Sequence, residues 1–266
     1  MAYGREGGDN TVPFIRDTLT SLTRLLRTFT RSPFYAFVYL VQPLIWLLLF
    51  TQIFKSVTML PDFPTSSYLQ FFAPGLIVTL AVFNSNFTGF ALLNDINFGV
   101  LEKVLVTPVN RYSLILGTVL YVAVTGVLQV AVVLIISFAL GATLATGVGG
   151  ILVTIVIVSL LGIGLTSLLG ALALRAKRVE PLIFVSNLIT LPLIFLSSAL
   201  IPAYLTPEWV QTAMKFNPVN YAVLAVRPLF LTGYDWNAIG VGLVILGAWA
   251  AAGIIVAEYA FRRFGD

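Results

Sequence analysis

The chain has 266 residues, of which 59% are hydrophobic and 10% are charged, and this balance excludes a soluble protein, whose usual shares are about 45–50% and about 25%. Its 15 basic and 11 acidic residues give a net charge of +4, which is too few charges for a protein that binds nucleic acid. The chain has no cysteine and no histidine, which excludes disulfides, thiolate nucleophiles, the usual zinc and haem sites and histidine-based acid–base catalysis.

The N-terminal part predicts a flexible tail at 1–13 and an amphipathic helix at 14–32. Apolar residues recur there every three or four positions, and arginines take the opposite face. A helix packed on a soluble core would show the same stripe, but the sequence offers no such core. We therefore predict that this helix lies in the membrane interface. Its apolar positions are Ile15, Leu19, Leu22, Leu26 and Phe29.

Residues 33–266 are expected to form an all-α integral membrane domain with six transmembrane helices. A helix needs about 20 residues to cross a hydrocarbon layer of about 30 Å, and charge-free runs of that length recur along this part of the chain. The predicted spans are 34–54, 71–93, 112–140, 148–174, 181–203 and 237–257.

Glycine and proline add detail to these spans. Pro43 is expected to kink the first span. The glycine-rich stretch at 141–150 predicts a tight hairpin between the third and fourth spans. In the fourth span, Gly162, Thr166 and Gly170 are spaced by four, which predicts a close helix contact, either within the chain or between two copies of it.

Between the fifth and sixth spans, residues 207–231 contain two apolar pieces that are too short to cross a membrane. They are expected to be re-entrant, and an ordinary amphipathic loop helix at the interface is the alternative. Thr206, Pro207 and Glu208 predict a helix start, with a capping hydroxyl, a proline at the first helical position and an acid near the positive end of the helix dipole.

Lysine and arginine predict the orientation, because cytoplasmic loops carry the excess of positive charge. Lys55, Lys215 and Arg227 are assigned to loops on one side, and the other basic residues fall on the side of the two termini. We therefore expect a multi-pass protein of the plasma membrane with both termini in the cytoplasm. The basic residues on that side are Arg5, Arg16, Arg24, Arg27, Arg31, Lys103, Arg111, Arg175, Lys177, Arg178, Arg262 and Arg263.

The sequence lacks the residues of several activities. No lysine follows a glycine, so the chain has no phosphate-binding G-x-x-x-x-G-K-[ST] loop. Acidic residues stand near span ends, as Asp95, Glu180 and Glu258 do, which argues against a proton relay. An ATP-independent channel or carrier stays open as an alternative, and a membrane-embedded enzyme is the weakest reading because no catalytic residues are recognised.

The loop at 97–117 mixes apolar and charged residues and contains Pro108, which stops a helix. This pattern is typical of a short helix, at about 98–108, that lies parallel to the membrane with one face free for a partner. A simple capped connector is the alternative reading.

Two motifs resemble the ABC-2 type permeases, the membrane subunits of ATP-binding-cassette exporters that are similar to the daunorubicin-exporter permease. The first is the 97–117 loop, which resembles that family's cytoplasmic coupling-helix loop. The second is NPVNYAVLAVR, which resembles its C-terminal signature and departs from it at Val219. The residues of the first motif are Gly99, Leu101, Glu102, Thr107, Pro108, Val109, Arg111 and Gly117, and those of the second are Asn217, Pro218, Tyr221 and Arg227.

The resemblance implies a permease that pairs with a second copy of itself, most simply as a homodimer, in contact with membrane lipid. It also implies a separate ATPase subunit in two copies, which binds ATP and Mg, whereas this chain binds no cofactor or metal and has no catalytic residue. The residues implied to couple the permease to the ATPase are Gly99, Val100, Leu101, Glu102, Lys103, Leu105, Thr107, Pro108 and Arg111.

Exposure to lipid would penalise polar groups in the spans, so they are candidates for the cargo path between two protomers. Nearby aromatic rings fit a hydrophobic cargo, although such rings more often pack against other side chains. We expect outward transport of a hydrophobic or amphipathic drug or lipid-like cargo, with a polysaccharide or lipid-linked glycan as the alternative. The path candidates are Gln42, Asn84, Asn86, Phe83, Phe87, Asn187, Ser197 and Ser198.

Overall fold

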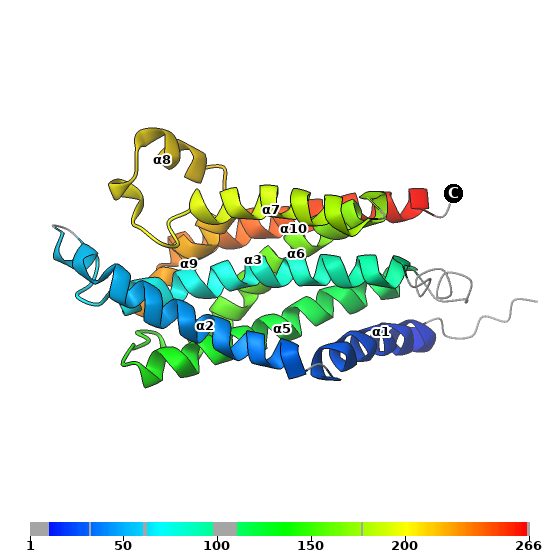
Figure 1. Ribbon diagram of the computed structural model, residues 1–266, viewed down its shortest axis with the longest axis horizontal. Helices are drawn as coiled ribbons and strands as arrows, with labels where there is room; N and C mark the ends of the chain where they lie inside the picture. Colours follow the sequence, from blue (N-terminus) through cyan, green and yellow to red (C-terminus); the bar gives the residue numbers. More distant parts are fainter. Residues whose placement is uncertain (1–10, 32, 61–62, 98–110, 177, 265–266) are drawn as a thin grey trace, which may run out of the picture.

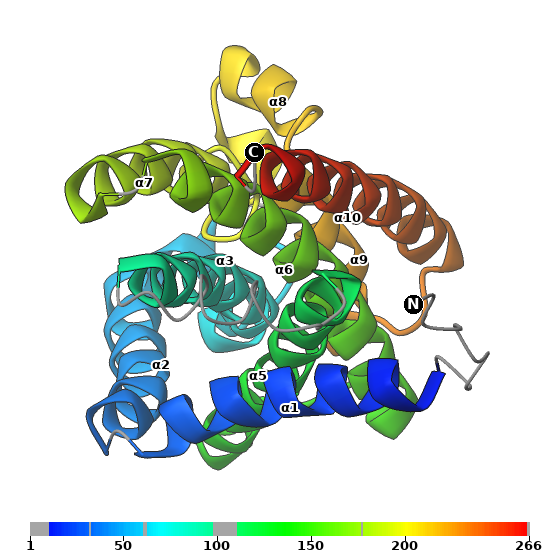
Figure 2. The same ribbon diagram turned by 90° about the vertical axis from the view of Figure 1, so that its right-hand side faces the viewer.

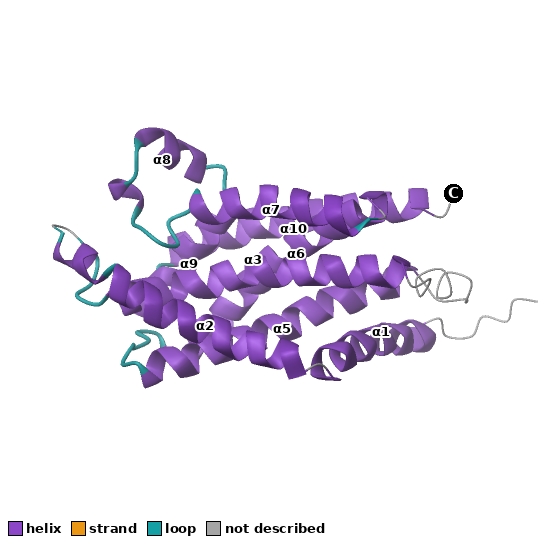
Figure 3. Cartoon of the chain, viewed as in Figure 1, coloured by secondary structure: helices purple, strands orange, loops and turns teal. Residues whose placement is uncertain are grey.

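The computed structural model describes residues 11–31, 33–60, 63–97, 111–176 and 178–264. Within these residues the regular secondary structure is all helix, and loops and turns join the helices (Figure 3). The long helices are α1 (Thr11–Arg31), α2 (Pro33–Ile53), α3 (Tyr68–Asn97), α5 (Arg111–Ala139), α6 (Gly147–Ala176), α7 (Val179–Phe195), α9 (Pro218–Leu231) and α10 (Trp236–Phe264). Shorter pieces are η1 (Lys55–Met59), η2 (Ala203–Leu205) and α8 (Glu208–Met214).

Most of the long helices run roughly along the long axis of the molecule, and α1 lies across one end of this bundle (Figures 1 and 2). Helix α3 is central: residues 71–82 are buried without interruption and include Phe72, Leu76 and Ile77. Helix α8 stands away from the bundle at the opposite end from α1 (Figure 1).

Four helices in the described part of the chain are long and apolar enough to cross a membrane. These segments are Tyr68–Asn86, Gly117–Ala139, Gly147–Ala176 and Trp236–Ala260. The described apolar part of α2 (Val41–Ile53) and the whole of α7 are shorter. A membrane-embedded helical fold is thus supported, and the count of six crossings stays a prediction.

The helix bounds differ from the predicted spans mainly in α7. This helix ends at Phe195, well before residue 203, although the apolar run continues. Turns replace the expected last two helical turns, and the Ser197 hydroxyl donates to the carbonyl of Ile194 at 2.6 Å. At the N-terminal side, α1 begins at Thr11 rather than at residue 14.

The predicted start of α8 is wrong in one detail. Pro207 is the capping residue, and it makes no side-chain cap. The Thr206 hydroxyl instead donates to the carbonyl of Ala203 at 2.7 Å, within the turn that precedes the helix. A threonine hydroxyl can bond backward as readily as forward, so it does not act as a helix cap here.

Close helix contacts do occur along α6, and they lie within the chain. A Cβ atom on Gly162 would come 2.9 Å from a methyl group of Val122 on α5. The tightest approach is between α6 and α10, where a Cβ on Gly253 would lie 2.5 Å from the carbonyl oxygen of Gly164 and 2.9 Å from its Cα. The contact between α6 and α10 was not among the expected ones.

We predict that Gly253→Ala destabilises the fold, because the added methyl group meets backbone that cannot turn aside. Overpacking of this kind usually costs about 1–3 kcal/mol. The midpoint of thermal unfolding in detergent should therefore fall. Gly247→Ala on the same helix is the control, since nothing lies within 4 Å of a Cβ there. Equal midpoints for the two variants would contradict this packing.

Candidate functional site

The segment expected to bind a partner, 98–110, lies outside the described residues, and so do Gly99, Val100, Leu101, Glu102, Lys103, Leu105, Thr107 and Pro108. Its two flanks are described: α3 ends at Asn97, and Arg111 is the first residue of α5. Both flanks lie at the end of the bundle that α1 crosses (Figure 1).

Helix α1 is seated directly on α5 close to this segment. A Cβ atom on Gly117 would lie 2.6 Å from the Cβ of Ser21 and 3.3 Å from the carbonyl oxygen of Thr18. Thr18 and Ser21 are buried, whereas Leu19 is exposed. The small side chains of α1 thus face the bundle, and Leu19 remains available for lipid.

The C-terminal motif begins with Asn217, which performs two tasks. Its side-chain oxygen accepts the N–H of Val219 at 2.9 Å, and this caps α9, whose first residue is Pro218. Its amide nitrogen donates to the carbonyls of Leu193 at 2.7 Å and Leu196 at 2.6 Å. Asn217 therefore joins the start of α9 to the end of α7.

Two further side chains of α9 strengthen this junction. Asn220 accepts the N–H of Ser198 at 3.0 Å and donates to the carbonyl of Met214 at 3.3 Å. The hydroxyl of Tyr221 donates to the carbonyl of Lys215 at 2.8 Å. Asn220 was not among the expected site residues, and the repeat of asparagine three positions after the cap was the signal that could have found it.

Arg227 completes the arrangement from deeper in α9. Only 9% of its surface is exposed, and its guanidinium donates to the carbonyls of Ser198 at 2.5 Å and Ala199 at 3.3 Å. The guanidinium carbon lies 3.8 Å from the ring centre of Phe71 on α3, which is a cation–π contact. The charge count treats Arg227 as a loop charge, and the structure corrects this, because the side chain is buried within a helix.

The first turns of α3 hold the same backbone from the other side. The hydroxyl of Tyr68 donates to the carbonyl of Leu200 at 2.7 Å. The carbonyl of Ala199 lies so close to Gly75 that a side chain at that position would collide with it. We call Tyr68, Asn217, Asn220 and Arg227 the clamp, and the backbone at 193–200 is what it holds.

The clamp provides hydrogen-bond donors for backbone carbonyls at the end of α7. Where α7 stops and the chain turns, several carbonyls lose their helical partners, and lipid offers none. The clamp supplies donors to the carbonyls of Leu193, Leu196, Ser198, Ala199 and Leu200. This role is structural, and it accounts for Asn217 and Arg227 of the C-terminal motif. Of the other two motif residues, Pro218 starts α9 and Tyr221 holds the adjoining turn.

The path candidates on α3 lie in a second polar cluster. Asn84, Ser85 and Asn86 are consecutive, and each bonds to a different helix. Asn84 donates to the hydroxyl of Thr125 on α5 at 2.9 Å, Ser85 to the carbonyl of Gly162 on α6 at 3.3 Å, and Asn86 to the hydroxyl of Thr190 on α7 at 3.4 Å. We call these three residues the hub.

The remaining path candidates are not brought together with the hub. Ser197 and Ser198 belong to the backbone that the clamp holds, and Gln42 is half-buried on α2. Phe83 packs its ring edge-on against Trp46, with 5.7 Å between ring centres. The side chain of Phe87 lies outside the described residues.

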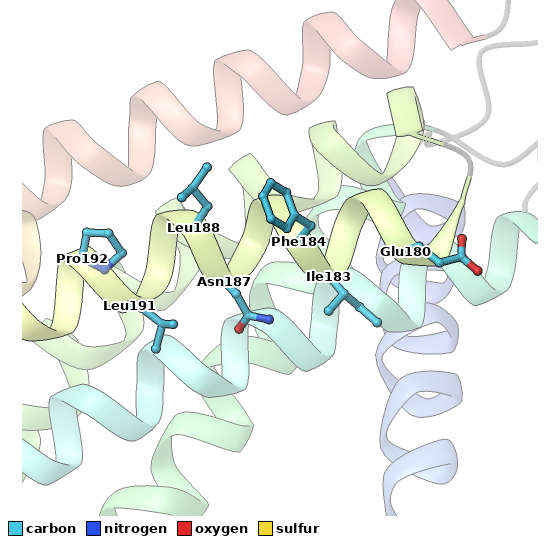
Figure 4. A pocket seen from close by; sticks show the side chains of 7 residues that line it. All are labelled: Glu180, Ile183, Phe184, Asn187, Leu188, Leu191 and Pro192. Carbon is cyan, nitrogen blue, oxygen red and sulfur yellow. The ribbon is translucent and has the colours of Figure 1, made fainter.

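Asn187 lies on the open face of α7, in a groove of about 670 Å³ (Figure 4). The groove is mostly apolar, and Phe184 and Leu188 are 70% and 62% exposed. Its lining residues are Glu180, Ile183, Phe184, Asn187, Leu188, Leu191 and Pro192. Within the described residues no group of acidic, histidine or cysteine side chains could hold a metal ion.

Comparison with known proteins adds a family match. The model described as "ABC-2 type transporter" matches residues 16–231, which include the hub and the clamp. The transport permease ycf38 of Cyanophora paradoxa is 32% identical over 218 residues, which cover 82% of this chain and 75% of that protein. The daunorubicin resistance ABC transporter permease protein DrrB1 of Streptomyces coeruleorubidus is 28% identical over 229 residues, which cover 86% of this chain and 79% of that protein.

We predict that Arg227→Met destabilises the protein strongly, because the carbonyls of Ser198 and Ala199 lose their donor. Each buried polar group left without a partner costs about 1–3 kcal/mol. The thermal unfolding midpoint in detergent should fall, and Arg227→Lys should recover part of the loss. Lys215→Met is the control, because it removes the same charge from an exposed position. If Arg227→Met and Lys215→Met unfold at the same temperature, the clamp does not hold this backbone.

Proposed function

This chain belongs to the ABC-2 type transporter family, and we propose that it moves a hydrophobic or amphipathic cargo, drug-like or lipid-like, out of the cell. It is a transport permease, the membrane component of an ABC transporter. Its apolar helices and its family make it a membrane protein. The observation that carries the function is the family match, which spans the hub, the clamp and the 98–110 segment in one continuous stretch.

The permease itself is not an enzyme, and ABC-2 permeases work with a separate ATPase subunit. We propose two copies of that subunit, each with ATP and Mg, bound to a homodimer of this chain in the plasma membrane. The absence of a G-x-x-x-x-G-K-[ST] loop from the sequence agrees with this division of labour.

The proposed site of coupling is the 98–110 segment, with Glu102 and Lys103 as its polar contacts to the ATPase. Two features support this choice. The segment connects α3 to α5 at the end of the bundle crossed by α1, and the charge distribution predicts that this end is cytoplasmic. Arg175 and Arg178, at the junction of α6 and α7, are exposed and can add contacts of the same kind.

ATP can drive transport only if the closed ATPase pair binds one permease conformation better than the other. In the proposed cycle, closure of the ATPase on 98–110 moves α3, which carries the hub. Cargo then passes between two protomers. The exposed apolar faces of α2, which include Leu44, Ile45 and Leu48, and of α7 support a second copy or lipid at these surfaces.

Two alternatives differ in cargo or class. A polysaccharide or lipid-linked glycan would need a polar passage. The groove on α7 is mostly apolar, which favours the hydrophobic or amphipathic cargo. An ATP-independent carrier would transport without any ATPase, and transport assays with and without that subunit separate the two classes.

We predict that Glu102→Arg uncouples the complex. A reversed charge at the proposed contact should lower permease-dependent ATP hydrolysis and transport by about tenfold or more, the size of effect that follows from losing 1.4 kcal/mol of interaction. The measurement is ATP hydrolysis and cargo flux of the purified complex in vesicles. Glu208→Arg, an exposed charge reversal on α8 at the opposite end, is the control. If both activities survive Glu102→Arg and also a Pro108→Ala change, 98–110 is not the coupling segment.

A further inference from the structure

Helix α7 is attached to the rest of the protein by a narrow strip. Its buried residues are Leu182, Ser186, Thr190 and Ile194, which are spaced by four and therefore form a single row. By contrast, fourteen of the thirty residues of α6 are buried. Only two members of the row on α7 are large and apolar, and beside the row Ile189 and Leu193 are partly buried against the core. Less hydrophobic burial therefore holds this helix in place than holds α6.

The polar members of the row add little attachment of their own. The hydroxyl of Ser186 donates to the carbonyl of Ile183 at 3.0 Å, and that of Thr190 donates to the carbonyl of Ser186 at 2.8 Å. Both bonds stay within α7 and tie it to no other helix. The outer side of α7 is the open face seen in Figure 4.

The two ends of α7 are held differently. At one end, Asn217 of the clamp binds the carbonyls of Leu193 and Leu196. At the other end, Arg178, Val179 and Glu180 are exposed. Pro192 lies just before the clamped end, where its missing N–H and its ring weaken the helix. Near that exposed end, Leu182 packs in a small apolar cluster with Leu93 and Ala173. The clamped end is thus held by hydrogen bonds and the other end by one buried leucine, which suits a pivot at the clamped end.

The hydrogen bond between α3 and α7 is a long one, and the bond from Ser85 to α6 is nearly as long, at 3.3 Å. Asn86 donates to Thr190 at 3.4 Å, near the longest distance that a hydrogen bond allows, whereas Asn84 donates to Thr125 at 2.9 Å. Asn86 is 8% exposed, and among the described residues its side-chain oxygen has no partner. A buried amide oxygen without a partner is unfavourable, so separation of α3 from α7 would let it gain one.

We propose that α7 pivots away from α3 at the clamp during each transport cycle, and that the Asn86–Thr190 contact is the joint that opens. This rests on the proposed function, because ATP binding on the partner subunit must supply the bias. Asn86 and Thr190 are then positioning residues that hold α7 against α3 in the resting state. Opening exposes both polar side chains beside the groove on α7.

The chain provides a matched pair of reporters for this movement. It has no cysteine, so a single Thr190→Cys or Thr125→Cys variant carries one thiol. Both threonines are 0% exposed, and both accept a hydrogen bond from an asparagine of α3. They differ in the helix that carries them, which is α7 for Thr190 and α5 for Thr125.

The experiment measures how fast a membrane-permeant maleimide labels each thiol, by mass spectrometry of the permease assembled with its ATPase in vesicles. We expect ATP with vanadate to accelerate labelling at residue 190 by about tenfold or more and to change labelling at residue 125 by less than about twofold, since labelling follows the population of the open form. Equal acceleration at both positions, or none at residue 190 while ATP is hydrolysed, would overturn the proposal.

A cross-link tests whether the movement is required. In Asn86→Cys/Thr190→Cys protein, a short bis-methanethiosulfonate reagent should join the two thiols through disulfides, with release of two sulfinates, and abolish the permease-dependent part of ATP hydrolysis. Reduction of the disulfides should restore it. Gly126→Cys/Ser159→Cys is the control, because a Cβ on Gly126 would lie 3.7 Å from the Ser159 hydroxyl, between α5 and α6. Full hydrolysis with α3 and α7 cross-linked would rule out the pivot.

These results separate two kinds of failure. If the untreated permease neither binds the ATPase nor changes its hydrolysis, the proposed function is wrong and the pivot falls with it. If hydrolysis depends on the permease but labelling and cross-linking at residue 190 have no effect, only the pivot is wrong.

Discussion

The structure depends on one requirement, that the backbone turning at the end of α7 must find hydrogen-bond donors among apolar helices. Arg227, Asn217 and Tyr68 share this requirement, and Arg227 is the charged member. Its guanidinium binds two successive carbonyls and rests on the ring of Phe71. A charged side chain in apolar surroundings is costly unless its hydrogen bonds are satisfied, and free carbonyls there are costly as well. Each group therefore lowers the penalty of the other, although the Nε–H of Arg227 has no partner among the described residues. The chain can thus turn where a plain apolar helix would have continued.

Helix α3 connects this junction to the rest of the molecule. Its first turns carry Tyr68, Phe71 and Gly75, which contact the clamped backbone or Arg227. Its middle carries the hub, which bonds to α5, α6 and α7. Its last residue, Asn97, leads into the segment proposed to bind the ATPase. A displacement at that segment would therefore reach, through one buried helix, the elements that line the proposed path.

Much of the fold could be predicted from the sequence, because lipid demands long uncharged runs and these runs are local. The bounds of α2, α5 and α6 lie close to the predicted spans for this reason, and so does the start of α10, which then runs to Phe264, past the predicted end at 257. The end of α7 could not be found in the same way. Its apolar run continues to residue 203, but Asn217, more than twenty positions later, binds carbonyls at the end of the helix, and Arg227 binds those of the turn that follows. The C-terminal motif could be recognised in the sequence as a pattern. Its role as a clamp became clear only from the hydrogen bonds in the structure. The grouping of Asn84 and Asn86 on one helix was readable, but their attachment to two different helices was not.

We propose that this permease forms a passage for cargo and that ATP on another subunit supplies the energy. The most direct test of this proposal is the rate of ATP hydrolysis by the ATPase in vesicles, measured with and without the permease and over a series of amphipathic and glycan cargoes. The account predicts that an amphipathic cargo accelerates hydrolysis only when the permease is present, and that cargo movement stops without ATP. Cargo movement through the permease alone, or hydrolysis that is indifferent to both permease and cargo, would contradict it.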